Sequence, residues 1–422
     1  MEVRIKKTSR EDTISGVPLN HVVRHGLLGH NVMLMNAAAE APPLVIVGAS
    51  VRGMAASASR AGFRVFAADL FGDHDLRPMA EAVSIVEPYP LGITTAVAGF
   101  PWAPVIYTGA LENHPSVIAS LAAHRPLAGA SADAVTQVRN PTVLAPAIRT
   151  AGLLAPETRT EPAGLPTDGT WLVKPIASAG GRGIRPWLGH GSDDPLNLWQ
   201  RRVSGCRLSV GYLLHAGQTQ IVAASRQLVG RRWCRAGPFA YCGSVDVDLA
   251  AVDAHVASQV ARLGDLLAGH FALAGLVGAD LIVDSRQSVW VIEINPRPTA
   301  SMELAERATG CSLVAMHVAS FGIKAPRRAE RHARTGTWAK AVLFARQAII
   351  FTEATLHAVV ARAASWTRDD GWPAVADIPE PPSSIPAGSP VCTLFAQGAS
   401  PRAALCHLRA RVAMIENVIL GR

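Results

Sequence analysis

The sequence lacks a continuous apolar run of about 18 residues, the length that a membrane-spanning helix needs. Its first residues, MEVRIKKTSR, carry charges, and no apolar core of a secretory signal follows them. The six cysteines form neither a CxxC pair nor a spacing typical of a zinc site. We therefore expect a cytoplasmic protein with reduced thiols and no membrane partner.

A basic stripe with interleaved aromatic residues, typical of nucleic-acid binding, is also missing. The formal net charge is +8, but the arginines are scattered and aromatic residues make up only 5% of the chain. A small anionic substrate such as a nucleotide suits this charge equally well. We therefore expect no nucleic-acid partner.

Lysine is the scarcest charged residue. The 40 basic residues include only five lysines: Lys6, Lys7, Lys174, Lys324 and Lys340. Arginine is a planar, bulky fork, whereas lysine is a compact point charge that suits a phosphate contact beside a strand. The isolated Lys174 therefore predicts a phosphate-binding role, with a surface lysine retained by chance as the alternative.

Lys174 lies in the stretch WLVKPIASAGGRGIR, which reads as a short strand followed by a glycine-rich loop. This is not the GxxxxGK[ST] phosphate loop, because the lysine precedes the glycines. Backbone N–H groups in such a loop are suited to capping phosphates. The loop residues that we expect to do so are Ser178, Ala179, Gly180, Gly181, Arg182 and Gly183.

Residues 1–42 show no clear hydrophobic period and read as an N-terminal extension. From Leu44 onward, apolar strand patterns alternate with helix patterns, including expected strands at 44–47, 63–70 and 102–109. Alternation of this kind indicates a parallel α/β sheet. Further along the chain we expect one helix within 136–160 that ends at a C-cap glycine, Gly152. We also expect a hairpin over 207–229 that turns at Ala216-Gly217, and helices near 251–274, 352–365 and 401–420.

The first strand is followed by a GxxxxG turn with Gly48 and Gly53, and Asp69 stands about 20 residues downstream of the turn. This is a weak version of the GxGxxG dinucleotide fingerprint, so a nicotinamide-dependent reductase is one interpretation. The other, which we favour, is that the two glycines only permit a tight turn and close packing.

A second hairpin is expected in GADLIVDSRQSVWVIEINPRP, with Asp280 near the start of one strand. Glu293 and Asn295 stand near the end of the other strand and share one face, because they are two residues apart. Antiparallel pairing brings the three side chains together, and their oxygens suit Mg²⁺. Arg297 adds a cation for transferred phosphate oxygens.

The alternative for this hairpin is a set of solvated charges at strand ends. A carboxylate between Ile292 and Ile294 in an otherwise apolar strand needs a partner, however, and this favours the metal interpretation.

Taken together, Lys174-Pro175, the SAGGRG loop and the D-x12-E-x-N-x-R pattern resemble the ATP-grasp superfamily. The resemblance implies a Rossmann-like preATP-grasp domain at 43–135, a two-subdomain ATP-grasp fold at 136–320 and a β-rich, helical appendage at 321–422. It also implies that Lys174 and the glycine loop bind ATP, and that Asp280, Glu293 and Asn295 hold Mg²⁺ or Mn²⁺.

Two positions depart from the family pattern. Family members commonly carry a second phosphate-binding lysine where this chain has Arg139, so either Arg139 substitutes for that lysine or the contact is absent. The hinge that lines adenine commonly begins with glutamate, whereas this chain has Arg201. Backbone contacts to adenine are still expected at Arg202 and Val203.

The stretches GASVRGMAASASRAG, IYTGALENHP and EINPRPTAS look closest to a branch that includes the tyramine–glutamate ligases of methanofuran biosynthesis. This similarity places Thr299 and Ser301 along the substrate site, with a helix N-cap at Ser301 as the alternative. The segment 231–245 either lines the cleft, through Arg231, Arg232, Tyr241 and Cys242, or is an ordinary turn.

The resemblance implies an ADP-forming carboxylate–amine ligase that acts through an acyl phosphate, with Arg297 and Lys174 as catalytic residues. Its partners would be ATP, a small carboxylate and an amine, and a homodimer is common among similar proteins. Two alternatives stay open at this point: the reductase, and an ATP-binding scaffold that has lost catalysis.

Overall fold

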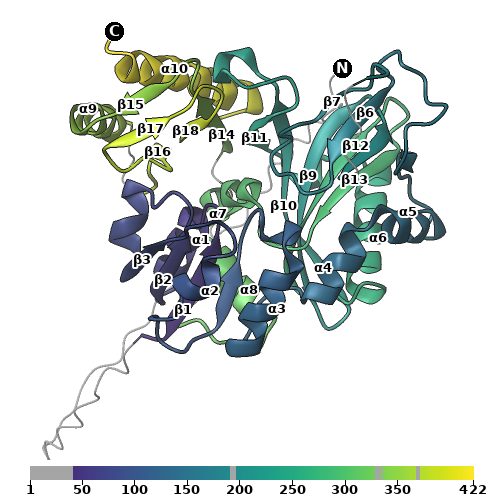
Figure 1. The fold of residues 1–422 in the computed structure, drawn as a ribbon, viewed down its shortest axis with the longest axis horizontal. Helices are drawn as coiled ribbons and strands as arrows, with labels where there is room; N and C mark the ends of the chain where they lie inside the picture. The colour runs from purple at the N-terminus through teal and green to yellow at the C-terminus, as the bar shows by residue number, and fades with distance from the viewer. Residues whose placement is uncertain (1–40, 191–195, 328–333, 335, 367–370) are drawn as a thin grey trace, which may run out of the picture.

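The computed structural model describes residues 41–190, 196–327, 334, 336–366 and 371–422 (Figure 1). The expected N-terminal extension therefore lies almost wholly outside the described residues. The architecture combines one parallel sheet with antiparallel sheets, and the predicted mixed fold class is confirmed. No helix among the described residues is long and apolar enough to cross a membrane.

A four-stranded parallel sheet forms the first layer, in the order β3-β2-β1-β4. Its strands are β1 (Pro43–Gly48), β2 (Arg64–Asp69), β3 (Ala82–Ile85) and β4 (Val105–Tyr107). The first two strands and β4 are almost fully buried, as expected where helices cover a parallel sheet. The strand expected at 102–109 begins only at Val105, because Pro101 and Pro104 have no N–H for the ladder.

The expectation of one unbroken helix in 136–160 is wrong, because two helices occupy this region. They are α4 (Ala132–Arg139) and α5 (Pro141–Thr150). The expected glycine at the helix end is found: Gly152 follows the second helix and has positive φ. Pro141 cannot continue α4, because it has no N–H and its ring clashes with the preceding turn. Asn140 instead caps α5 by accepting a hydrogen bond from the N–H of Thr142. The break leaves Arg139 at the end of α4.

The glycine-rich loop belongs to a small antiparallel sheet ordered β5-β8-β6-β7. The strands are β5 (Thr158–Arg159), β6 (Trp171–Pro175), β7 (Arg185–Pro186) and β8 (Asn197–Arg201). Its core contains Leu165, Trp171, Val173, Trp187 and Trp199. The loop connects β6 to β7, so this sheet carries Lys174 and the glycines as one unit.

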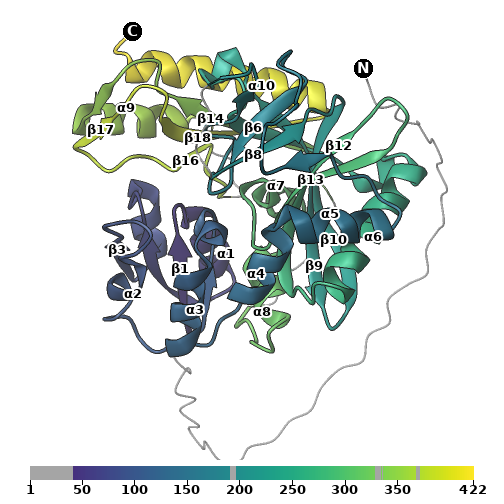
Figure 2. The same ribbon diagram turned by 45° about the vertical axis from the view of Figure 1, so that its right-hand side comes forward.

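An eight-stranded sheet ordered β13-β12-β9-β10-β11-β14-β18-β16 forms the largest layer (Figure 2). Its strands are β9 (Cys206–His215), β10 (Gln218–Val229), β11 (Tyr241–Asp246), β12 (Gly275–Val283), β13 (Val289–Asn295), β14 (Thr337–Phe344), β16 (Val375–Ala376) and β18 (Pro390–Gly398). Both Ala216 and Gly217 have positive φ, as the predicted two-residue hairpin turn requires. The C-terminal region thus continues the sheet that begins with the hairpin of the predicted metal site. The domain boundaries themselves stay a prediction.

The remaining elements lie on and between these sheets in both views (Figures 1 and 2). They are α1 (Arg52–Arg60), α2 (Ile93–Ala96), α3 (Pro115–His124), α6 (Ala254–Gly269), α7 (Glu303–Thr309), α8 (Leu313–Ala319), α9 (Glu353–Ala364), α10 (Pro401–Ile419) and the strand pair β15 (Ile349–Phe351) and β17 (Ser383–Ile385). The helices expected near 251–274, 352–365 and 401–420 are α6, α9 and α10.

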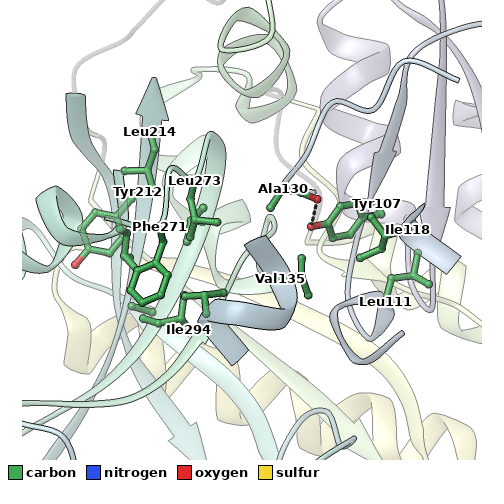
Figure 3. Close-up of a cluster of buried hydrophobic side chains, with 14 of the residues drawn as sticks. Tyr107, Leu111, Ile118, Ala130, Val135, Tyr212, Leu214, Phe271, Leu273 and Ile294 are labelled. Atoms are coloured by element: carbon green, nitrogen blue, oxygen red, sulfur yellow. Dashed lines mark hydrogen bonds between the residues drawn. The ribbon is translucent and has the colours of Figure 1, made fainter. Parts of the chain in front are cut away.

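The parallel sheet and the large sheet share one buried core (Figure 3). Tyr107 lies in it at the end of β4, and its hydroxyl donates to the carbonyls of Ala130, at 3.1 Å, and Pro296, at 2.9 Å. Pro296 directly follows the metal-site strand β13. This contact therefore fixes the first layer against the end of the strand that carries Glu293 and Asn295.

A buried ion network joins the first layer to α7 and to the C-terminal region. The Arg52 guanidinium donates to both oxygens of Glu303, at 2.9 and 3.1 Å, and to Asp377 at 2.9 Å. Arg307 and Lys340 also contact Glu303. Burial by itself raises the pKa of Glu303, but these three cations hold it well below its usual range. The carboxylate is therefore ionised and fully paired.

We predict that Arg52→Met lowers the free energy of unfolding by about 3–5 kcal/mol, because it leaves buried carboxylates without their main partner. Urea unfolding followed by tryptophan fluorescence measures this loss. Glu157→Gln, in the exposed pair with Arg159, is the matched control and should cost under about 1 kcal/mol. Equal losses in the two variants would contradict a structural role for the network.

Candidate functional site

The paired strands β12 and β13 place the three predicted metal-site residues together. Asp280 lies directly opposite Glu293, and Asn295 lies opposite Gly278 on the same strand pair. The expectation that Asp280 stands near the start of its strand is wrong, since β12 begins at Gly275. Because β12 is longer than expected, Asp280 pairs directly with Glu293, and cross-strand partners have their side chains on one face of the sheet.

The two carboxylates of this pair have opposite shifts in pKa. Burial and the charge of Glu293 raise the pKa of Asp280 to about 6. Burial by itself raises the pKa of Glu293, but Arg139 and Lys174 outweigh it and hold the pKa below its ordinary value. Two acidic groups are therefore held side by side: the charge of Arg297 does not outweigh burial at Asp280, whereas Arg139 and Lys174 do so at Glu293.

This donor set fits a hard divalent cation. Gln227 donates to one oxygen of Asp280 at 2.7 Å, and the Asn295 amide donates to the other at 3.4 Å. In the described part of the chain no three His, Cys, Asp or Glu side chains form a metal cage. The amide oxygen of Asn295 would thus join the two carboxylates, as in Mg²⁺ sites that are completed by water and phosphate oxygens.

Arg139 contacts the metal-site hairpin directly. Its guanidinium forms an ion pair with Glu293 and donates to the Asn113 side-chain oxygen at 2.8 Å. The side chain is mostly buried. The position where the family carries its second lysine therefore lies within the site, beside the carboxylate.

Lys174 approaches the same carboxylate from the small sheet. Its ammonium group donates to Gln200 at 3.2 Å, and its charge contributes to the low pKa of Glu293. Lys174 and Gln200 lie on neighbouring strands, since β6 pairs with β8. The internal lysine singled out by composition is thus close to the candidate metal site.

The glycine-rich loop packs against the backbone of residues 239–241. Gly180, Gly181 and Gly183 all have positive φ, and a side chain at Gly181 would collide with the Phe239 carbonyl oxygen at 2.1 Å. The Gly180 carbonyl accepts a hydrogen bond from the Tyr241 N–H at 2.9 Å. Glycine is required here because the loop must pass close to another backbone segment.

The other predicted loop residues have ordinary loop contacts. The N–H of Arg182 donates to the Ala179 carbonyl at 3.2 Å, and the Ser178 carbonyl accepts from Asn113 at 3.3 Å. The Arg182 side chain is exposed. The arginine of the loop therefore faces solvent, and the capping of phosphates by the loop backbone stays a prediction.

The expected adenine hinge is only partly available for backbone contacts. The N–H of Arg202 already donates to the Thr170 carbonyl at 2.8 Å. An adenine contact at Arg202 would therefore use its carbonyl, together with the backbone of Val203.

Arg297 is held by a carboxylate from the first layer. It forms two hydrogen bonds with Glu112, at 2.5 and 2.9 Å, and lies 3.5 Å from the Asn295 side-chain oxygen. Burial by itself raises the pKa of Glu112, but the Arg297 charge outweighs it and keeps the pKa below its ordinary value. Glu112 thus orients Arg297 beside the metal-site amide.

Sequence reasoning missed Arg207, which lies on the same face of the large sheet. Arg207 lies two residues before Ser209, which pairs with Asp280, so Arg207 shares the face of the carboxylates. Burial and the nearby charges of Arg202 and Arg231 lower the pKa of Arg207. The alternation of side chains along β9 could have revealed Arg207, because β9 pairs with β12, the strand that carries Asp280. Clustered cations suit a polyphosphate.

The structure also places three further residues that the sequence singled out: Ser301, Tyr241 and Cys242. The N-cap alternative for Ser301 is wrong: its hydroxyl lies 3.3 Å from that of Ser209 and 3.2 Å from that of Thr299, and Met302 occupies the cap of α7. Tyr241 contacts the glycine loop through its N–H. Cys242 is fully buried, and all six cysteines are free thiols.

The GxxxxG turn shows the features of a packed turn. A side chain at Gly48 would overlap the Thr108 hydroxyl, at 2.1 Å. Asp69 is fully buried and accepts hydrogen bonds from the N–H groups of Val51, Phe71 and Gly72. Its carboxylate is thus occupied by the protein backbone and not offered to a ribose, which favours the structural interpretation of the two glycines.

The sequence resembles a known protein family over part of its length. Residues 138–301 match the family model described as the ATP-grasp domain. No protein with a curated description matches the sequence.

Solved structures resemble nearly the whole chain in fold. Biotin carboxylase from Campylobacter jejuni has a TM-score of 0.63 at 14% identity, covering 90% of this chain and 96% of that one. Carboxyaminoimidazole ribonucleotide synthase from Aspergillus clavatus has a TM-score of 0.64 at 12% identity, with 90% and 99% covered. L-amino acid ligase from Bacillus licheniformis has a TM-score of 0.61 at 14% identity, with 88% and 97% covered. Residues 138–301 therefore match an ATP-grasp domain, and nearly the whole chain resembles these solved structures in fold.

Proposed function

We propose that this protein is an ATP-dependent ligase that joins a carboxylate to an amine and releases ADP and phosphate. The observation that carries the proposal is the convergence of Lys174 and Arg139 on Glu293, directly opposite Asp280. Three segments that are distant in sequence supply these residues. Paired carboxylates beside cations and a glycine loop are suited to phosphoryl transfer, in which positioning and charge neutralisation are the protein's task.

ATP and Mg²⁺, or Mn²⁺, are the proposed cofactors. The Aspergillus synthase was solved with ATP, and a biotin carboxylase domain dimer from Hydrogenobacter thermophilus was solved with MgADP. In this chain Asp280, Glu293 and Asn295 would hold the metal, and Lys174 and the loop from Ser178 to Gly183 would contact phosphates. A homodimer and a cytoplasmic location remain part of the proposal.

The proposed reaction has two steps. A substrate carboxylate oxygen attacks the γ-phosphorus of ATP, so the bond to the bridging oxygen breaks and ADP leaves. The amine then attacks the carbonyl carbon of the acyl phosphate, loses a proton and expels phosphate, which leaves an amide. A bound divalent cation supplies charge neutralisation at the phosphates.

The side chains of this site have separate roles in that scheme. Lys174 neutralises charge on the phosphate oxygens, and backbone N–H groups of the glycine loop cap them. Arg297, oriented by Glu112, stabilises the acyl phosphate and the oxyanion of its tetrahedral successor. Release of Arg139 from Glu293 would let its charge reach the phosphates, in place of the family's second lysine.

The substrate class follows from the resemblance to the tyramine–glutamate ligase branch and from the likeness to an L-amino acid ligase. We propose glutamate or a glutamyl compound as one substrate, with a tyramine-like amine as the other, in the biosynthesis of a methanofuran-type cofactor. The arginine cluster at Arg202, Arg207 and Arg231 suits anionic ligands generally.

The competing proposal of an ATP-binding scaffold rests on two departures from the family pattern. Arg139 stands where the family carries its second lysine, and Arg201 stands where the family carries a glutamate at the adenine hinge. A scaffold would bind ATP without turnover across a broad panel of acids and amines.

We expect Lys174→Ala and Glu293→Ala each to lower turnover by at least ~10², since each removes a charge contact in the transition state. A phosphate-release assay with glutamate and tyramine-like amines measures this. Lys324→Ala, at an exposed lysine, is the matched control and should retain wild-type turnover. Near-normal turnover in both site variants would exclude the proposed site.

ATP with Mg²⁺ should raise the melting temperature, because a ligand that binds only the folded state stabilises it. NADH should leave the melting temperature unchanged, since Asp69 is occupied by backbone N–H groups. Thermal melts with each nucleotide at millimolar concentration make the comparison. A rise with NADH alone would favour the reductase.

The nucleotide product distinguishes ligase chemistries. Attack on the γ-phosphorus should yield ADP and phosphate in equal amounts with the amide, as measured by chromatography of the reaction mixture. Formation of AMP and pyrophosphate would instead indicate an adenylate intermediate and would refute the acyl phosphate.

A further inference from the structure

Asn113 connects the glycine-rich loop to the metal-site carboxylate. Its side-chain N–H donates to the Ser178 carbonyl at 3.3 Å, and its side-chain oxygen accepts from Arg139 at 2.8 Å. The partners fix the orientation of the amide, because a guanidinium only donates and a backbone carbonyl only accepts. Arg139 in turn pairs with Glu293. A continuous path of polar contacts therefore runs from the loop to the candidate metal site.

The position of Asn113 in the fold suits a coupling role. It ends a short turn, Leu111–Asn113, that follows β4 in the first layer, whereas the loop belongs to the small sheet. The preceding residue, Glu112, holds Arg297. One turn thus contacts both the loop and the arginine beside the site. The loop is otherwise attached to the large sheet through the Tyr241 N–H, a backbone contact.

We propose that Asn113 is a positioning residue that keeps the glycine-rich loop closed over ATP and couples this closure to the placement of Arg139. The proposal rests on the proposed function, because it assigns ATP to the space under the loop. A closed loop slows the departure of bound nucleotide and excludes water from the phosphates. Asn113 acts through Ser178 and Arg139 and has no part in the bond changes.

Two substitutions of Asn113 distinguish its hydrogen bond to Ser178 from its hydrogen bond with Arg139. Asn113→Asp removes the donor to Ser178 but retains an acceptor for Arg139, whereas Asn113→Ala removes both. Because a neutral hydrogen bond contributes a modest net amount, we expect either variant to speed amide exchange in residues 176–184 by about 2–10-fold in the nucleotide-free protein. We expect the KM for ATP to rise about 2–10-fold with kcat changed less than about threefold in Asn113→Asp.

Peptide-resolved hydrogen exchange and steady-state kinetics measure these effects. Asn140→Asp is the matched control: it makes the same substitution next to Arg139, and aspartate serves equally well as the N-cap of α5. It should leave loop exchange and KM at wild-type values. Unchanged melting temperatures show that the loop responds locally, since a merely structural role would lower them.

Loop exchange at the wild-type rate in both Asn113 variants would overturn the proposal. Equal acceleration by Asn140→Asp would also overturn it, because the effect would then be general to added charge. Calorimetry of the wild-type protein with ATP and Mg²⁺ tests the proposed function separately. Absence of binding there refutes the ligase, whereas the exchange experiment in nucleotide-free protein tests the contact itself.

Discussion

The cross-strand pairing of Asp280 with Glu293 is the constraint on which the rest of the site depends. Two carboxylates on one face of a sheet repel each other, and burial increases the free-energy cost of holding both ionised. The pKa of about 6 at Asp280 reflects this cost. This pair therefore needs compensation. Arg139 and Lys174 supply it at Glu293, and Gln227 donates a hydrogen bond to Asp280. The same pair of carboxylates provides oxygen ligands that fit a divalent cation.

Charge compensation also explains why several layers must assemble before the site exists. Arg139 comes from the end of α4, Lys174 from the small sheet, and Glu112 from the first layer, where it orients Arg297. The buried network around Arg52 and Glu303 joins the first layer to α7 and the C-terminal region in the same way. The site is therefore a junction of layers and not a property of any single domain.

Much of the local structure was predictable from the sequence. The parallel α/β pattern, the hairpins at Ala216-Gly217 and at 284–288, and the terminal helix follow from periodicity and turn residues. The break at Pro141 and the late start of β4 after Pro104 were predictable in principle, since both follow from the missing proline N–H. The contacts of Glu112, Asn113 and Arg207 were not, because each partner is far away in the sequence.

The sequence by itself determined which functional groups the chain carries: the isolated Lys174, a glycine loop, and two carboxylates and an amide at hairpin spacing. These are local facts, and residue type and strand alternation suffice to read them. Only the tertiary structure decided which cation pairs with which carboxylate, that Asp69 is occupied by backbone N–H groups, and that Asn113 bridges Ser178 and Arg139. The physical reason is that electrostatic and hydrogen-bond partners depend on distance in space, which packing of the layers sets.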